Sequence, residues 1–245
     1  MKREFNHLNQ SIGYRIPDWK SPSHPQRKVM TGRYCRLEPL EVDIHAKSLW
    51  SANAMDTEAK SWTYLPYGPF DSFNSYQSWL TEECLRNDPM FFAIIDPKRN
   101  AAVGVASYLR IQPKLGSIEV GHLHFSNHLQ RTPASTEAMY LMMANVFELG
   151  YRRYEWKCND QNMPSRLAAQ RLGFSFEGIF RQAGIVKGHN RDTAWFAAMD
   201  HEWPAICTAM QTWLNPTNFD DDGNQKSSLS SLTAPLLHYG IAELE

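Results

Sequence analysis

The sequence predicts a single mixed α+β domain, and three observations carry that prediction. Apolar residues recur at helical spacing in some segments and alternate with polar residues, as in strands, in others. These segments follow the order strand, two helices, three strands, helix, strand, helix, two strands, helix, without an internal repeat. A length of 245 residues suits one large or two small domains. We expect one domain over residues 31–215, after an irregular N-terminal arm (1–30) and before a flexible tail (216–245).

The first half of the domain begins with a strand at residues 34–37. Asp43 is a candidate N-cap for the helix that follows, and Ser72 is a candidate N-cap for a second helix. An aromatic loop, residues 62–70, lies between these helices. Three strands come next, at residues 91–95, 102–109 and 117–125. The short connection between the last two predicts an antiparallel hairpin.

The second half alternates helices and strands. Thr132 and Pro133 suit the N-cap and first position of a buried helix, which Gly150 ends. A helix also begins at Asn162 and ends at Gly173. The remaining elements are a strand at 153–158, two strands at 174–180 and 193–199 joined by a loop with Gly184 and Gly188, and a last helix at about 201–214.

Composition and charge argue against a nucleic-acid-binding protein, a membrane protein and a secreted disulfide-rich protein. The formal net charge is −1, which implies no long-range attraction to nucleic acid or to an anionic membrane. No apolar run approaches the ~20 residues of a spanning helix, and the first residues lack a signal-peptide core. The four cysteines form no C-x-x-C pair. We therefore expect a cytoplasmic protein with reduced thiols and no nucleic-acid or membrane partner.

The stretch LQRTPASTEAMYLM, residues 129–142, raises a question of its own. It reads as a loop that enters a helix, and helix N-termini bind anions through free N–H groups and the helix dipole. Arg131 adds a full positive charge there. The alternative is that Thr132 only caps a core helix and that Arg131 is solvated. From this stretch alone both interpretations stand.

Three segments together resemble a known family. They are GRYCRLEPLEVDIHAKSLW (32–50), SIEVGHLHFSNHLQRTPASTEAM (117–139) and NDQNMPSRLAAQRLGFSFEGIFRQ (159–182). In order and spacing they are similar to the GNAT superfamily of acetyl-CoA-dependent N-acetyltransferases, and most of all to its RimJ/RimL branch. The resemblance covers about residues 30–200. It implies the GNAT fold, a mixed and mostly antiparallel sheet with splayed middle strands flanked by helices, and acetyl-CoA as co-substrate.

The resemblance also implies a coenzyme site. The family's pyrophosphate loop, Gln/Arg-x-x-Gly-x-Gly/Ala, falls here on residues 130–135, where Pro133 and Ser135 replace the glycines. Proline has no N–H to donate, but the first turn of a helix leaves others free. The implied coenzyme contacts are Gln130, Arg131, Thr132, Ala134, Ser135, Thr136, Asn162 and Ser165, with the backbone of Leu123, His124 and Phe125.

Two residues are candidates for proton transfer. Many family members use a tyrosine to protonate the leaving thiolate, and Ala169 stands at about that position here. The RimL-like branch often has a serine in its Asn-x-x-Ser element, which matches Ser165. Glu119 is the candidate that accepts the amine proton. The alternatives are a helix cap for Ser165 and a structural salt link for Glu119.

The aromatic loop implies an acceptor wall. Trp62, Tyr64 and Tyr67 lie where the family binds its acceptor, and His122 is a further candidate; the alternative is a loop that only covers the core. His122 and His124 form an H-x-H pair without an evident third ligand, so we expect no metal. We expect no calcium loop at 220–231, because Ser231 stands where a bidentate glutamate is needed.

These observations predict an N-acetyltransferase that acts on the primary amine of a small molecule or of a peptide or protein N-terminus. The alternative is a non-catalytic GNAT-fold module that binds coenzyme A or an amine ligand. A different nucleotide binder would need a Walker or Rossmann fingerprint, which the sequence lacks. The sequence leaves a homodimer open and does not identify the amine.

Overall fold

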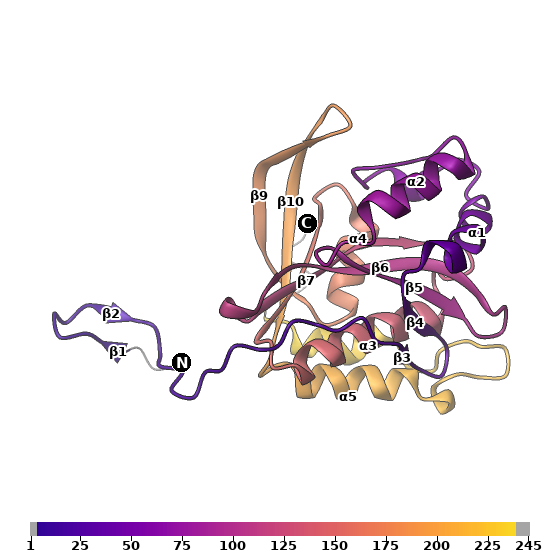
Figure 1. Cartoon of the computed structure of the whole chain (residues 1–245). Helices are drawn as coiled ribbons and strands as arrows, with labels where there is room; N and C mark the ends of the chain where they lie inside the picture. Colours follow the sequence, from indigo (N-terminus) through magenta and orange to yellow (C-terminus); the bar gives the residue numbers. More distant parts are fainter. Residues whose placement is uncertain (1–3, 239–245) are drawn as a thin grey trace.

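An eight-stranded mixed sheet organises the molecule in the computed structural model, which describes residues 4–238 (Figure 1). The strand order is β3-β4-β5-β6-β7-β8-β10-β9, and every neighbouring pair is antiparallel except β7 and β8. The strands are β3 (Met30–Thr31), β4 (Arg36–Pro39), β5 (Met90–Asp96), β6 (Ala101–Gln112), β7 (Ser117–Phe125), β8 (Arg153–Asn159), β9 (Ser175–Val186) and β10 (His189–Met199). The predicted α+β class and the mostly antiparallel sheet are confirmed.

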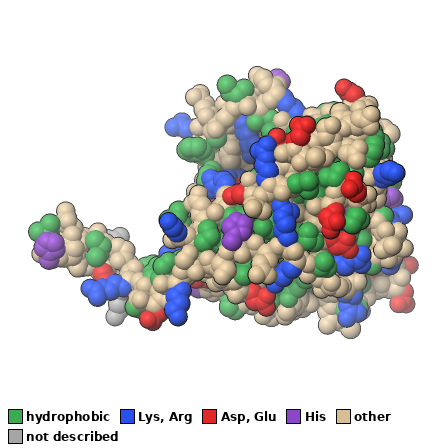
Figure 2. Space-filling view, viewed as in Figure 1, with side chains coloured by type: hydrophobic (Ala, Val, Ile, Leu, Met, Phe, Trp, Pro, Cys, Tyr) green, Lys and Arg blue, Asp and Glu red, His purple; other side chains and the backbone are tan. Residues whose placement is uncertain are grey.

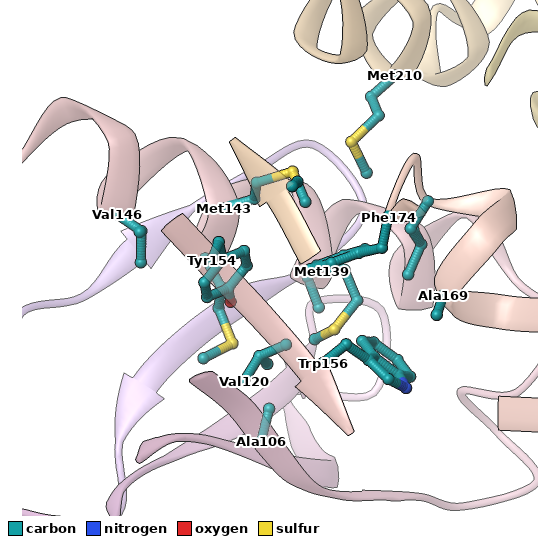
Figure 3. Packing of buried hydrophobic residues seen from close by; sticks show 14 of the residues in the cluster. Ala106, Val120, Met139, Met143, Val146, Tyr154, Trp156, Ala169, Phe174 and Met210 are labelled. Carbon is teal, nitrogen blue, oxygen red and sulfur yellow. The ribbon is translucent and has the colours of Figure 1, made fainter. Parts of the chain in front are cut away.

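Helices cover both faces of this sheet, so its central strands are apolar on both sides. In β5, Phe91 and Ala93 belong to a core with α1 and α2, whereas Phe92 and Ile94 belong to a second core with α3, α4 and α5. Met139, Met143 and Met210 meet Tyr154 and Phe174 in this second core (Figure 3). The helices are α1 (Val42–Asn53), α2 (Phe73–Glu83), α3 (Pro133–Glu148), α4 (Met163–Arg171), α5 (Trp203–Leu214) and α6 (Leu229–Thr233); the 3-10 turns are η1 (Lys60–Trp62), η2 (Pro113–Leu115), η3 (Pro216–Asn218) and η4 (Ala234–Leu236).

The parallel pair β7–β8 is short, and its early end leaves an opening in the middle of the sheet. The strands pair over four residues each, from Ser117 opposite Arg153 to Val120 opposite Trp156, and then separate. Two residues of β7, His122 and Leu123, oppose a single residue of β6, which is a β-bulge. Beyond Val120 the backbone of β7 therefore faces an opening instead of a partner strand.

The helix caps follow the sequence with one exception. The side chains of Ser72, Thr132 and Asn162 accept the predicted N-terminal hydrogen bonds of α2, α3 and α4. Asp43, however, does not cap α1. The N-cap is Glu41, whose N–H donates to His45 Nδ1, so the chain turns into the helix earlier and Asp43 lies inside the first turn.

The β9–β10 hairpin and the N-terminal arm differ from the expected outline. β9 and β10 form a longer hairpin than predicted, because Gly184 pairs with Arg191 inside the ladder and the turn shrinks to residues 187–188. In the N-terminal arm, β1 (Glu4–Phe5) and β2 (Ser11–Ile12) form a small hairpin. Figure 2 shows this hairpin standing clear of the body, with hydrophobic side chains on its surface.

The stretch expected as a flexible tail contains helical turns in its described part. α6 begins after Ser228, which caps it, and Leu229 is fully buried. Thr233 Oγ1 donates to Arg171 O at 3.1 Å and so ties this segment to α4. The polar composition concealed the apolar anchor. Residues 1–3 of the expected arm and 239–245 of the expected tail lie outside the described residues.

A buried carboxylate fixes the position of α3. Glu137, which is 6% exposed, accepts hydrogen bonds from the backbone N–H groups of Arg33, Tyr34 and Cys35 at 2.8, 2.5 and 2.8 Å. A Cβ at Gly32 would lie 2.3 Å from the Glu137 carboxyl, so only glycine permits this approach. The β3–β4 turn is thus locked against the first half of α3, whose N-terminus borders the β7–β8 opening.

We expect Glu137→Gln to destabilise the protein by about 2–3 kcal/mol, because an amide cannot accept all three bonds and its NH₂ would face a backbone donor. Urea or guanidinium denaturation measures this change. Glu148→Gln, an exposed change on the same helix, is the control and should shift stability by less than about 0.5 kcal/mol. Equal stabilities of the two variants would contradict this account of α3.

Candidate functional site

The opening between β7 and β8 holds a cavity of about 220 Å³. Residues 119–123 of β7 form one side and residues 156–159 of β8 the other. The first turn of α4, through Asn162 and Ser165, and loop residues 61 and 64–66 close the ends. Since β7 and β8 no longer pair here, the backbone groups of β7 beyond Val120 that point away from β6 lack a partner strand and can bind a molecule in the opening.

Ser165 is held with its hydroxyl at this cavity. Its N–H donates to Asn162 Oδ1 at 3.2 Å, and its Oγ accepts from Trp156 Nε1 at 3.1 Å. An Oγ that accepts from the indole keeps its own proton for donation elsewhere. Cys158 lies beside it, and burial raises the pKa of that thiol to about 11, so it is a neutral thiol at physiological pH.

Glu119 also reaches the cavity, within a group of buried charges. Its Oε2 lies 2.9 Å from both Lys157 Nζ and Arg110 Nε, while its Oε1 points towards Gly121. Burial raises the pKa of Glu119, and the two cations oppose that rise. One oxygen is therefore committed to the cations and the other faces the opening.

The charges continue along β8. Arg110 and Arg153 each pair with Glu155 at 2.6 Å, and Lys157 Nζ sits 3.5 Å from the centre of the Trp195 ring. Sequence reasoning missed Lys157 and Arg110 as neighbours of Glu119. The polar face of the predicted strand at 153–158 carried a signal, but only the parallel register with β7 brings that face to Glu119.

The two histidines of the H-x-H pair differ in position. His122, at the bulge with φ of +51°, lines the cavity, and its Nδ1 lies 3.1 Å from Tyr67 Oη. His124 is buried, stacks on Trp62 and lies 2.9 Å from Ser61 Oγ. Burial lowers the pKa of each to about 4, so both are neutral at neutral pH.

The aromatic loop contributes one of its three candidate residues to the cavity wall. Tyr64 lines the cavity, and its hydroxyl donates to Gln161 O at 3.0 Å. Trp62 and Tyr67 lie behind the wall, because their rings pack against His124 and Trp79 respectively. The structure therefore does not bring these two rings to the cavity.

Two contacts hold this loop across the opening. In addition to the Tyr64 bond, Lys187 Nζ donates to Trp62 O at 2.7 Å from the turn of the β9–β10 hairpin. Arg191, on β10, lines the cavity and carries a buried Nε without a hydrogen-bond partner. Sequence reasoning missed Arg191, because this residue was expected in the loop between the last two strands, and nothing in the sequence indicates that the hairpin folds over the site.

In the loop before α3, an arginine takes the left-handed backbone conformation that glycine usually adopts. Arg131 takes the left-handed conformation, at φ of +59°, and its side chain is exposed. Thr132 Oγ1 accepts from Ser135 N–H at 3.4 Å at the helix start. Arg131, Thr132 and Ser135 thus stand at the N-terminus of α3, where the helix dipole favours an anion.

The other predicted coenzyme residues of this loop have internal contacts. Gln130 Nε2 donates to Phe125 O at 2.7 Å, and buried Thr136 accepts from Arg171 at 3.0 Å. Ala134 packs against the core. The side chains of Gln130, Thr136 and Ala134 support the loop. These residues would therefore contact a ligand through their backbone groups.

The described part of the chain offers neither a metal site nor a membrane-spanning helix. Within residues 4–238, no three His, Cys, Asp or Glu side chains gather in a way that could hold a metal ion. None of the helices in the same range has the length and apolar character to cross a bilayer.

Solved structures with this architecture include acetyltransferases. The chain superimposes on the crystal structure of a GCN5-related N-acetyltransferase from Brucella melitensis with a TM-score of 0.87 and 44% identity, over 89% of this chain and 99% of that one. It also resembles the coenzyme A complex of RimL, the ribosomal L7/L12 alpha-N-protein acetyltransferase, with a TM-score of 0.60 over 70% of this chain and 98% of that one. At 20% identity the RimL likeness shows the fold alone.

Sequence comparison agrees. An uncharacterized N-acetyltransferase, p20, from Bacillus licheniformis is 27% identical over 112 residues, or 46% of this chain. That match spans 63% of the length of the curated relative. The sequence profile of the acetyltransferase (GNAT) domain matches residues 35–175, more than half of the chain. The expected GNAT fold is confirmed, and the chain belongs to the GNAT acetyltransferase family.

Proposed function

We propose that the protein is an acetyl-CoA-dependent N-acetyltransferase that transfers the acetyl group directly to a primary amine. The observation that carries this proposal is the β7–β8 opening, in which a hydroxyl donor, Ser165, and a free carboxylate oxygen of Glu119 face one cavity. Attack of an amine on a thioester needs a base for the amine proton, a polarised carbonyl and an acid for the leaving thiolate. The opening offers a candidate for each.

We assign binding of the acetyl donor to residues of β7, of α4 and of the N-terminus of α3. A backbone N–H group of β7 between Leu123 and Phe125 that points away from β6 would hydrogen-bond the thioester carbonyl, which gains negative charge during attack. Ser165 would protonate the sulfur, and Asn162 would orient the pantetheine arm. Arg131 and the first turn of α3 would hold the pyrophosphate.

We assign acceptor binding and deprotonation to Glu119, Tyr64 and His122. Glu119 Oε1 would take the amine proton, directly or through water, and the raised pKa brings that carboxylate closer to an amine in basicity. Tyr64 and His122 would contact the acceptor. Neutral His122 adds no positive charge that would repel a protonated amine.

We favour a small-molecule amine over a polypeptide N-terminus. The Tyr64–Gln161 and Lys187–Trp62 bonds close the opening from above, and the cavity of about 220 Å³ suits a compact acceptor. The unpartnered Nε of Arg191 favours an acceptor that carries an anionic or carbonyl group. The RimJ/RimL-like branch, whose RimL acts on a ribosomal protein, remains the competing assignment.

An acceptor screen tests the activity and the substrate class together. The assay follows free thiol released from acetyl-CoA in the presence of amino acids, small amines and short peptides. Acceptor-dependent release supports the transferase. A melting-temperature shift with acetyl-CoA but no release across the panel would favour the alternative, a non-catalytic module that binds coenzyme A.

Ser165→Ala should lower kcat by about 10- to 100-fold with little change in KM, because the hydroxyl acts only as the thiolate forms. Steady-state kinetics with the best amine measures this effect. Trp156→Phe is the matched control, since it removes the same Trp156–Ser165 bond but keeps the hydroxyl. If both variants lose the same activity, the bond matters for structure and Ser165 is no acid.

Glu119→Gln should reduce kcat by about 100-fold and remove the acid limb of the pH profile of kcat/KM. A base must be deprotonated, so the wild-type rate falls as pH drops through the Glu119 pKa, which burial places above its ordinary value of 4.5. Glu155→Gln is the control, because Glu155 shares Lys157 and Arg110 but does not line the cavity. An acid limb that persists in Glu119→Gln and vanishes in His122→Gln would assign the base to His122.

A further inference from the structure

One cation in the lining of the β7–β8 cavity has no counterion among the described residues. The charged residues of that lining are Glu119, Lys157 and Arg191. Glu119 and Lys157 pair with each other at 2.9 Å. Arg191 forms no ion pair within residues 4–238, and its Nε is buried without a hydrogen-bond partner there. Because a partly buried charge without a partner is unfavourable, this side chain calls for an anion.

The carboxylates beside Arg191 already have other partners. Asp192, the next residue in sequence, accepts a hydrogen bond from the Gln182 N–H at 2.7 Å. Asp160, whose N–H donates to Asp192 O, pairs with Arg166 at 2.7 Å. Neither carboxylate lines the cavity. The guanidinium of Arg191 is therefore available to a bound molecule.

The β9–β10 hairpin carries Arg191 past the end of β8. The ladder between β8 and β10 begins at Thr193, so the earlier residues of β10 pair with β9. Figure 1 shows this hairpin rising beyond the other strands of the sheet. Side chains two residues apart share one face of a strand, and on the face of Arg191 the ring of Trp195 lies 3.5 Å from Lys157 Nζ. Arg191 is thus on the face of the sheet that carries Glu119.

Two hydrogen bonds fix the hairpin over the cavity. Lys187, at the hairpin turn, donates from its Nζ to Trp62 O at 2.7 Å and so ties the hairpin to the aromatic loop. Tyr64, in that loop, donates to Gln161 O at 3.0 Å, just beyond the end of β8. These contacts keep Arg191 in the lining of the cavity that also contains the proposed base.

The charge balance favours a carboxylate over a phosphate. Lys157 and Arg191 carry positive charge and Glu119 negative charge, so the lining has one net positive charge. A monoanion balances that charge, and a planar carboxylate matches the fork of a guanidinium group. A phosphate monoester carries a charge of about −1.5 to −2 at pH 7 and would leave the cavity with excess negative charge.

We propose that the acceptor is a primary amine that also carries a carboxylate, as a free amino acid does, and that Arg191 binds this carboxylate. The proposal rests on the proposed function, whose acceptor class it specifies. Arg191 selects the acceptor and has no part in the chemical step. In a polypeptide N-terminus the α-carboxyl group of the first residue is part of an amide bond, so that acceptor lacks the anion.

Paired acceptors test the carboxylate. α-Amino acids, and ω-amino acids of increasing chain length, are each compared with their own carboxamide by following thiol release from acetyl-CoA. The best carboxylate acceptor should exceed its carboxamide in kcat/KM by about 10- to 100-fold, as for a charge-assisted hydrogen bond. The amine of an α-amino acid carboxamide is less basic, so a larger share of it is neutral and chemistry alone favours the carboxamide. Transfer without a preference for the carboxylate in any pair would overturn the proposal and leave the transferase intact.

Arg191→Gln should abolish this preference. The ratio of the two kcat/KM values should fall to about 1, mostly through a higher KM for the carboxylate acceptor, because the ion pair forms in the ground state as well as in the transition state. Arg181→Gln is the matched control, since Arg181 is exposed on the same hairpin and does not line the cavity. It should leave the wild-type ratio unchanged. A preference that persists in Arg191→Gln would assign the carboxylate to another residue and overturn the proposal.

Two further measurements on Arg191→Gln separate acceptor recognition from other roles. KM for acetyl-CoA should equal that of wild type; a rise confined to KM for acetyl-CoA would place Arg191 on the donor and contradict the proposal. The melting temperature without ligand should not fall, because the described residues give Arg191 no ion pair to lose. A lost preference at unchanged melting temperature is the expected result. Absence of transfer from acetyl-CoA to any amine would instead contradict the proposed function.

Discussion

The rest of the structure depends on one constraint, the failure of β7 and β8 to remain paired. Four parallel pairs hold the strands together up to Val120 and Trp156, and the bulge at His122–Leu123 then turns β7 away. A sheet opened in its middle leaves backbone groups that must find partners or a ligand. The helices on both faces keep the two halves joined around this gap, and Glu137 ties the start of α3 to the β3–β4 turn so that the helix N-terminus stays beside it.

The charged side chains along the opening are arranged in a way that suits an amine ligand. Alternating charges run along it from Arg153 through Glu155 and Lys157 to Glu119, so no carboxylate is left with an unbalanced charge in a half-buried site. The same pairing leaves one oxygen of Glu119 free. His122, which burial keeps neutral, also lines the cavity, and Glu119 is the carboxylate in its lining, so we propose Glu119 as the group that attracts and deprotonates an amine.

The sequence was informative where local chemistry decides structure. The caps at Ser72, Thr132 and Asn162, and the glycines that end α3 and α4, follow from backbone preferences of single residues and were predicted correctly. Lys157, Arg110 and Arg191 were missed because only strand register and the fold of the β9–β10 hairpin bring them to the cavity. The segment 229–237 was misjudged because the polar residues 220–228 that precede it dominate the composition, whereas buried Leu229 and Thr233 anchor it.

A crystal structure with acetonyl-coenzyme A, a thioether in which a methylene stands between the sulfur and the acetyl carbonyl so that the group cannot be transferred or hydrolysed, tests the central claim most directly. The account predicts that the carbonyl oxygen faces the β7 backbone between His122 and Phe125, with the carbon chain entering between β7 and β8 and the sulfur-side atoms within contact distance of Ser165 Oγ. An acyl group bound outside the β7–β8 opening, or one that leaves Ser165 and Glu119 on the same side and away from the carbonyl, would contradict it.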